Sequence, residues 1–467
     1  LSSGQAVLAF LVFIACLLVG HMGLRIEAGW IMALDTSAPY AGRLATELSL
    51  LGLVFVIGIW LLRPHAQRLS GSHWLTIMIC AGLVMRILWI GSPPIFEDDS
   101  WRYLWDGAVV AHGLNPYEVP PRAVMTMASD DPLIAAQKAI LAADPEARAV
   151  VDKINHPWLA TIYPPVAQAF FAAAYYLGPF SPLAWQGVIL LVELISLALI
   201  CLTLQRLNLP LFLSSIYWLN PLLIEEFINS MHMDVLLLPF MALACWAIVT
   251  KRAWVSSIML VLAAGIKVWP LVLWPAMHPL RRLGWRATWL LAPLTLVAAL
   301  LVFAPLLLNY ADNLDKNSGF VAYADSWEMN DAFFMGLKGM LHQWAGIELA
   351  TVTRLLRYAL AAGVAGLSLY FWFRGTEEEA GILSAGLIVT ATLFLFSPTQ
   401  FPWYFAWLFP FLVFRPLMPL IWLTALLPLY YWRFEAVNQG WTKGFDQQLV
   451  WLEFLPVLVG LACVAWG

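Results

Sequence analysis

Long apolar runs, separated by short polar connections, extend over most of this sequence. A transmembrane helix needs about 17–25 mainly apolar residues, and runs near that length can be drawn at 6–24, 45–62, 74–90, 183–204, 209–224, 235–250, 288–309, 351–373, 381–396, 403–413, 416–432 and 450–466. The pattern therefore predicts an all-α polytopic membrane protein with about 12–13 transmembrane helices.

Two apolar stretches do not fit as simple spans. The stretch 162–177 is short and follows a long polar segment, so we expect it to be interfacial or re-entrant. The stretch 254–274 is interrupted by Gly265 and Pro270, and basic residues stand on both sides of it. It is predicted to enter and leave the membrane by the same face, as a re-entrant hairpin.

The basic residues of the connections support that hairpin. Lys and Arg concentrate in cytoplasmic loops, and the basic connections fall on one side only if 254–274 is re-entrant; they contain Arg63, Arg68, Arg206, Lys251, Arg252, Arg281, Arg282, Arg286, Arg374 and Arg415. The polar loops 91–155, 225–234, 310–348 and 397–402 then share the outer face. All the connections with unusual chemistry lie in that second group.

Composition narrows the class of protein but does not assign a function. The chain has 467 residues, is 62% hydrophobic and carries a net charge of −4, too small to indicate a nucleic-acid partner. Its five cysteines all fall in apolar runs, so neither disulfides nor a metal cluster are expected. We treat 1–467 as a single integral membrane domain, with N-terminal extra helices at 1–72, a first outer loop at 91–160 and a second outer loop at 310–348.

The densest chemistry lies in residues 96–117, FEDDSWRYLWDGAVVAHGLNPY. Asp98 and Asp99 are candidates for a general base, although Asp99 could instead cap a helix starting near residue 100. Arg102 follows them at helical spacing, which favours an ion pair with either acid or contact with a phosphate. Asp106 could bind a ligand or hold the loop. Glu97 is expected to be solvated.

A second polar segment, 220–234, is expected at the outer face. Pro221 should break the preceding span. Glu226, His232 and Asp234 follow, and Asp234 could be either a functional acid or a helix cap. One His and one Asp do not form a metal site.

Three cations outside the basic loops could bind a phosphate. Lys267 stands at the tip of the predicted hairpin, where a buried ammonium needs an anionic partner unless it reaches the interface. Arg354 and Arg357, three residues apart, form another basic face at the outer start of a span. Aromatic residues near the outer loops, Trp403, Tyr404 and Trp407, could form an interfacial belt or a wall of a binding site.

These motifs together resemble a known family. The pattern D-D-x-x-R-Y-x-W-D-G from Asp98 to Gly107, followed by G-x-N-P-Y, resembles bacterial mannosyltransferase-like members of the GT-C superfamily, which use polyprenyl-phosphate sugars. It resembles the catalytic subunit of the first GPI mannosyltransferase more distantly. The segments 220–234, 327–330 and 397–407 also resemble this family. Two departures are Met231, where the family pattern has glycine, and an acidic motif that follows the third predicted span rather than the first.

The resemblance implies an inverting glycosyltransferase that moves a sugar, mannose by family habit, from a polyprenyl-phosphate carrier to a lipid-linked or glycan hydroxyl. It also implies that 91–160 is the outer catalytic loop. It implies Asp98, preferred as the base, and Asp99 as catalytic residues, and phosphate binding by Arg102, Lys267, Arg354 and Arg357. Sugar or acceptor binding is expected from Tyr103, Trp105, Asp106, Asn115, Tyr163, Glu226, His232, Asp234, Trp327, Asn330, Trp403 and Tyr404.

No cofactor or metal is implied, because the lipid-phosphate sugar is a substrate. The expected partners are membrane lipids, the donor and a glycolipid or glycan acceptor. The expected location is the bacterial inner membrane, with an outward-facing site. A transporter or flippase of lipids or lipid-linked sugars is the alternative, and a non-catalytic scaffold is a third. A transporter should place its charges near mid-membrane; acids gathered at one surface favour the enzyme.

Overall fold

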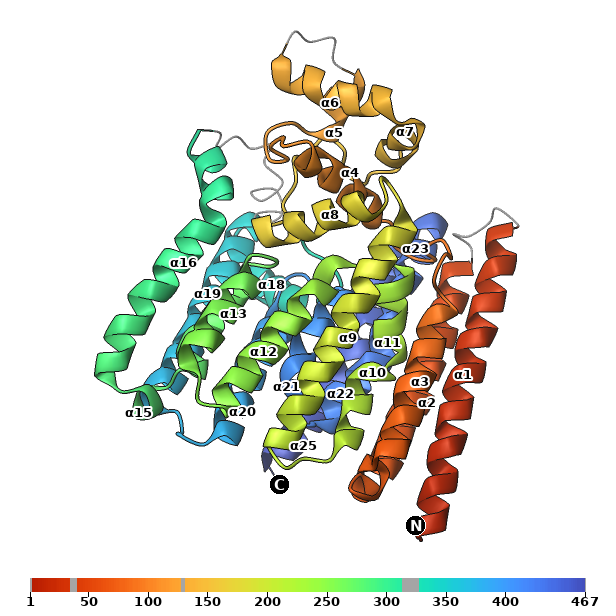
Figure 1. Cartoon of the computed structure of the whole chain (residues 1–467), viewed down its shortest axis with the longest axis vertical. Helices are drawn as coiled ribbons and strands as arrows, with labels where there is room; N and C mark the ends of the chain where they lie inside the picture. The colour runs from red at the N-terminus through yellow and green to blue at the C-terminus, as the bar shows by residue number, and fades with distance from the viewer. Residues whose placement is uncertain (1, 34–39, 127–130, 313–326, 467) are drawn as a thin grey trace.

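The computed structural model describes residues 2–33, 40–126, 131–312 and 327–466, and all regular elements in those ranges are helices (Figure 1). A bundle of helices runs along the long axis. Its members are α1 (Ser3–Ala33), α2 (Ala41–Leu62), α3 (Ser72–Ile87), α9 (Pro182–Arg206), α12 (Leu237–Val249), α13 (Ala253–Ala264), α16 (Trp285–Asp312), α19 (Leu349–Arg374), α20 (Glu379–Phe396), α22 (Met418–Leu426) and α25 (Val450–Trp466).

A group of shorter helices covers one end of this bundle and is called the lid. It contains α4 (Ser100–Ala111), α5 (Pro121–Thr126), α6 (Pro132–Ala143) and α7 (Pro145–Val151). Between lid and bundle, α8 (Pro165–Leu177) lies across the ends of the long helices (Figure 1). That position agrees with the interfacial interpretation of 162–177.

The remaining pieces are short. They are α10 (Ser215–Trp218), α11 (Pro221–Ile224), α14 (Leu273–Met277), α15 (Leu280–Leu283), α18 (Ala332–Ala345), α21 (Phe409–Leu412), α23 (Trp432–Gln439) and α24 (Thr442–Gly444). Single turns of 3-10 or π helix connect several of them, including a π turn at Glu225–Asn229 and 3-10 turns at Met233–Leu236, Trp269–Val272, Pro402–Leu408 and Leu427–Tyr431.

The described helices confirm an all-α polytopic membrane protein, with fewer long spans than expected. Seven of them are long and apolar enough to cross a bilayer, or eight if Leu211–Trp218 and Pro221–Asn229, bent by 51°, count as one span. Several other apolar runs end early or are broken. Proline fixes φ and removes a backbone donor, so the runs that contain Pro270, Pro402 and Pro428 are divided into short helical pieces.

The stretch 254–274 is a hairpin, as the basic loops predicted. The chain leaves α13 at Gly265, turns, and returns through α14 beside the start of α13. The Trp274 indole nitrogen donates to Ser257 Oγ (2.9 Å), and a ring nitrogen of His278 lies 3.2 Å from the carbonyl oxygen of Ala253. Both ends therefore meet at the end of the bundle opposite the lid, which we call the basic end, and the tip points toward the lid.

A buried ion pair attaches α3 to the rest of the bundle. Arg86 of α3 donates to both carboxylate oxygens of Glu193 in α9, at 2.9 and 2.6 Å, and neither side chain is exposed. The same guanidinium lies over the Trp218 ring, 3.6 Å from its centroid, and donates to the Trp218 carbonyl. Because an unpaired buried charge is costly, this contact holds α3, α9 and α10 together.

Candidate active site

Three elements bring charged side chains together beneath the lid. The hairpin tip carries Lys267, the turn before α12 carries Asp234, and the loop before α4 carries Asp99. Lys267 Nζ lies 3.2 Å from Asp234 Oδ1 and 3.8 Å from the centre of the Tyr404 ring. Asp234 also accepts a 2.9 Å hydrogen bond from the Trp407 indole nitrogen. Lys267 therefore binds a carboxylate and an aromatic face inside the protein.

Asp99 faces this pair. The pKa of Asp99 is raised to about 6, chiefly by burial; the carboxylates of Asp98 and Asp234 act in the same direction, and Lys267 and Arg102 oppose them. The Asp99 side chain makes no capping hydrogen bond to α4. The geometry thus favours an electrostatic role near Lys267 over the helix-cap interpretation.

Asp98 is held by a different partner. Its carboxylate accepts a hydrogen bond from the Asn155 side-chain amide, which comes from the loop after α7. Partial burial raises the pKa of Asp98, and the hydrogen bond from Asn155 opposes that shift. A carboxylate with a raised pKa and a fixed orientation has the properties that a general base needs.

Arg102 does not form the ion pair expected from its spacing. Within the described residues its guanidinium donates to backbone carbonyls, of His156 at 3.0 Å and of Asn155 at 3.5 Å. The i,i+4 argument failed because α4 begins at Ser100, so both acids precede the helix. Arg102 instead fixes the loop that carries Asn155, the partner of Asp98.

The aromatic residues of α4 pack the lid onto α8. Tyr103 and Trp105 are buried, and the Tyr103 ring stacks on Phe171 at 4.8 Å. Tyr163 meets Tyr103 edge to face at 5.1 Å. Asp106 accepts a weak hydrogen bond from Gln168 (3.4 Å), and burial raises the Asp106 pKa. These contacts fix the position of α4 on α8.

Asn115 lines a cavity of about 580 Å³ between α8 and α16. Its amide donates to Glu118 at 2.8 Å and approaches Asn309 at 3.5 Å. The neighbouring Tyr117 hydroxyl donates to the Tyr163 carbonyl. The G-x-N-P-Y turn thus joins the lid to α8 and α16.

Trp403 lies inside a stack of three rings. The His232 ring is parallel to it at 3.9 Å, and the Phe401 ring is parallel to it at 4.3 Å. Rings centred so close cannot lie side by side on one face, so they cover opposite faces of the indole. Trp403 is only 5% exposed, and this packing leaves neither face for a sugar.

The polar segment 220–234 is entirely buried in the structure. Glu226 accepts from the Tyr431 hydroxyl at 2.7 Å and lies 3.4 Å from the His232 ring nitrogen. Met231 has φ of +59°, the left-handed region that favours glycine, which explains why the family pattern has glycine there. A turn in this conformation directs His232 back toward Trp403.

The second outer loop is described from residue 327 onward, and 313–326 lie outside the described residues. The Trp327 ring lies 4.9 Å from His156, next to the Asn155 that binds Asp98. Arg357 donates to the Trp327 carbonyl at 2.7 Å. Asn330 is buried and donates to Glu453 (2.9 Å) and to the Gln400 carbonyl. Trp327 is therefore near the acids, with Arg357 supporting it.

Arg354 is not brought to the Lys267–Asp234 pair by any described contact; it lies exposed on α19.

Sequence reasoning missed Asn155, which nothing but its position at the end of the outer loop could have indicated. It also expected a solvated Glu97, whereas burial raises the Glu97 pKa well above its usual value, with Asp99 and Asp98 adding to the shift. Within the described residues, no three His, Cys, Asp or Glu side chains gather as a metal site would require.

Comparison with known proteins assigns the family. A family model described as alpha-(1->6)-mannopyranosyltransferase, N-terminal domain, matches residues 4–281, more than half of the chain. Alpha-(1->6)-mannopyranosyltransferase A of Mycobacterium tuberculosis is 24% identical over 358 residues, covering 71% of this chain and 64% of the relative, so less than two thirds of that protein's length is matched. No solved structure matches. The chain belongs to the alpha-(1->6)-mannopyranosyltransferase family.

Proposed function

We propose that this protein is an inverting mannosyltransferase that moves mannose from a polyprenyl-phosphate carrier to a hydroxyl of a lipid-linked or glycan acceptor. The observation that carries the proposal is an acid pair beneath the lid, in which Asp99 interacts with the Lys267–Asp234 pair while its neighbour Asp98 is held by Asn155. Family membership supports mannose as the sugar.

The two acids have different places in this reaction. The acceptor oxygen bonds to the anomeric carbon as the bond from that carbon to the phosphate oxygen breaks, and the phosphate leaves with the electron pair. With inversion, the attacking and leaving oxygens lie on opposite faces of the sugar. The base should therefore stand away from the cation that binds the phosphate. Asp98, bound to Asn155, fits the base, which takes the acceptor proton; Asp99 faces Lys267.

Lys267 is the cation proposed to bind the donor phosphate. The Lys267 side chain is 18% exposed, whereas that of its partner Asp234 is 1% exposed. A phosphate there would be stabilised by a charge already held in place, which is the arrangement that lowers barriers most effectively. Arg102 and Arg357 act by fixing the loops beside the acids.

The proposed site faces outward from the bacterial inner membrane. Connections with Lys and Arg, such as those between α2 and α3 and between α12 and α13, lie at the end of the bundle opposite the lid (Figure 1), and such connections are usually cytoplasmic. The proposed chemistry uses side chains alone, with membrane lipids, the donor and the acceptor as partners.

The test is a transfer assay with purified protein, synthetic polyprenyl-phosphate mannose and a mannoside acceptor. We expect released polyprenyl phosphate and an α-mannosylated acceptor, with the anomeric configuration inverted relative to the donor. Asp98→Asn should lower the rate at which both products form by about 10²–10⁴-fold, and protein without acceptor is the matched blank. Movement of lipid-linked sugar across vesicles without any transfer would refute the enzyme and favour the flippase.

A further inference from the structure

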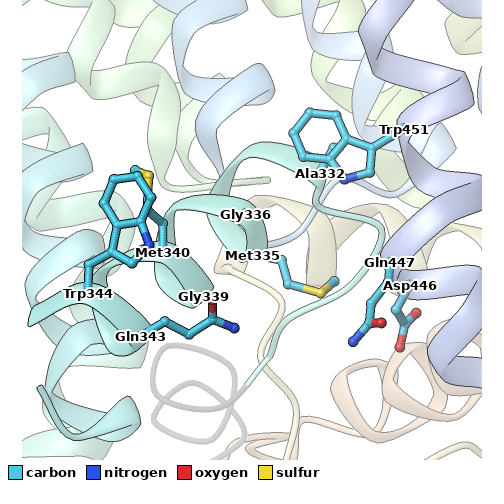
Figure 2. Close-up of a pocket in the computed structure, with 10 residues that line it drawn as sticks. All are labelled: Ala332, Met335, Gly336, Gly339, Met340, Gln343, Trp344, Asp446, Gln447 and Trp451. Carbon is cyan, nitrogen blue, oxygen red and sulfur yellow. The ribbon is translucent and has the colours of Figure 1, made fainter. Parts of the chain in front are cut away.

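A second cleft lies outside the site described above, between α18 and the segment that leads into α25. Its volume is about 400 Å³, within the range of about 300–1,000 Å³ typical of small-molecule sites. Figure 2 shows Gln343 and Trp344 of α18 on one side, and Asp446, Gln447 and Trp451 on the other. None of these residues contributes to the Lys267–Asp234 pair or to the acid pair.

The side chains of this cleft combine aromatic faces with polar groups that are not used elsewhere. Trp344 is 82% exposed, and within the described residues its ring meets no other ring. In the same ranges the amides of Gln343 and Gln447 make no hydrogen bond, and Asp446 has only a distant partner, Arg433, at 3.6 Å. Amides and carboxylates can bind hydroxyls, and flat apolar indole faces can pack against the C–H groups of a sugar.

Glycines of α18 make the space for this cleft. A Cβ atom on Gly336 would come within 3.1 Å of the Trp451 ring, so glycine lets the indole lie close to the helix. A Cβ atom on Gly339 would meet nothing within 4 Å, because that glycine faces the open cleft. The cleft is therefore a product of the α18 sequence and its packing on Trp451.

The chain segment that leads into α18, one wall of the cleft, starts beside the candidate active site. Trp327 contacts His156 beside the acid pair, and four residues later Asp331 caps α18 by accepting from the Met335 amide at 2.7 Å. An acceptor with its reactive hydroxyl near Asp98 could continue past Trp327 toward α18.

We propose that this cleft binds mannose units of the acceptor glycan that precede the reacting one. This inference rests on the proposed function and makes it more specific, because it requires a glycan acceptor longer than one sugar. A lipid chain is a poorer occupant, since it would bury Asp446 and two amides without hydrogen-bond partners.

The experiment compares an α-(1→6)-linked mannose disaccharide with the corresponding hexasaccharide as acceptors. Trp344→Ala and Gly339→Leu, which remove an indole and fill the cleft, are each expected to raise KM for the hexasaccharide about 10-fold and to leave kcat/KM for the disaccharide unchanged. Trp289→Ala, at a 72% exposed position on α16, is the matched control. Equal hexasaccharide KM in all forms would overturn the proposal, as would a change in donor KM, which would indicate a lipid occupant.

Calorimetric titration of the hexasaccharide into the full-length protein separates this inference from the enzyme. Wild type is expected to bind, and Trp344→Ala and Gly339→Leu to bind about 10-fold more weakly, even if no mannose transfer is ever detected. Absence of transfer would then count against the proposed function alone. Absence of any binding difference between wild type and both variants would refute the cleft.

Discussion

Replacing Lys267 should separate the stability of the site from its proposed catalytic role. The ammonium lies 3.2 Å from Asp234, which is 1% exposed and would be left as an unpaired buried charge in Lys267→Met. Removing one partner of a buried ion pair typically costs about 3–5 kcal/mol. The remaining hydrogen bond from Trp407 to Asp234, 2.9 Å long, offsets only part of that cost. We therefore expect Lys267→Met to unfold at a clearly lower temperature.

The double variant Lys267→Met/Asp234→Asn removes both charges and keeps the amide within reach of Trp407. Neutral replacement of a buried pair is often close to neutral for stability, so most of the lost stability should return. Activity should not return. Loss of a charged hydrogen bond of about 1.5–3 kcal/mol to the donor phosphate corresponds to about 10- to 100-fold in kcat/KM.

The assay is initial-rate kinetics at limiting donor, with thermal unfolding measured on the same preparations. Asp234→Asn alone is the control that keeps the cation. Wild-type kcat/KM in a stably folded double variant would show that Lys267 does not bind the phosphate. The buried pair would then be structural, and the phosphate would need another cation.

Three further predictions concern the acids and the buried ion pair. Asp98→Asn should lower kcat by about 10²–10⁴-fold with donor KM unchanged, while Asp99→Asn stays active; steady-state kinetics giving the opposite order would assign the base to Asp99. The pKa of Asp99 is raised from 3.8 to about 6, so the folded protein binds this proton more tightly than the unfolded chain does. The stability linked to the bound proton is fully present below pH 3.8 and is lost as pH rises through 6. Thermal scans should thus show Asp99→Asn more stable than wild type at pH 7–8, by about 1–2 kcal/mol after solvent screening, and similar to it near pH 4; no difference at either pH would contradict this. Arg86→Met should cost about 3–5 kcal/mol by stranding the buried Glu193, and Arg86→Met/Glu193→Met should recover much of it in chemical unfolding; a fully stable single variant would disprove the structural role.

The class of protein and the hairpin could both be predicted from the sequence, because each depends on a pattern that extends along the whole chain. The apolar runs indicated membrane helices, and the basic connections indicated that 254–274 returns to its own side. The number of long spans was overestimated, since hydropathy does not register how prolines such as Pro402 and Pro428 divide an apolar run.

The sequence located the region of the candidate site but not its contacts. The Asp234–Lys267 pair joins different elements, and the Arg86–Glu193 pair joins residues 107 positions apart, so no local spacing could reveal either. The stack of three rings around Trp403 likewise depends on how two distant loops meet. Helical spacing predicted an ion pair for Arg102 that the structure does not form, because the helix starts after the acids.

The hairpin also has a consequence for how the protein is made. A lone lysine entering the bilayer interior costs about 2.5–3.5 kcal/mol, and Lys267 must travel from the basic end to the lid end. Asp234 stands just before α12, the helix that precedes α13, so the two charges lie at matching ends of adjacent antiparallel helices. Helices α12 and α13 can therefore insert as a pair whose charges neutralise each other. Loss of either charge alone would then reduce the amount of protein that reaches the membrane, before any effect on turnover is seen.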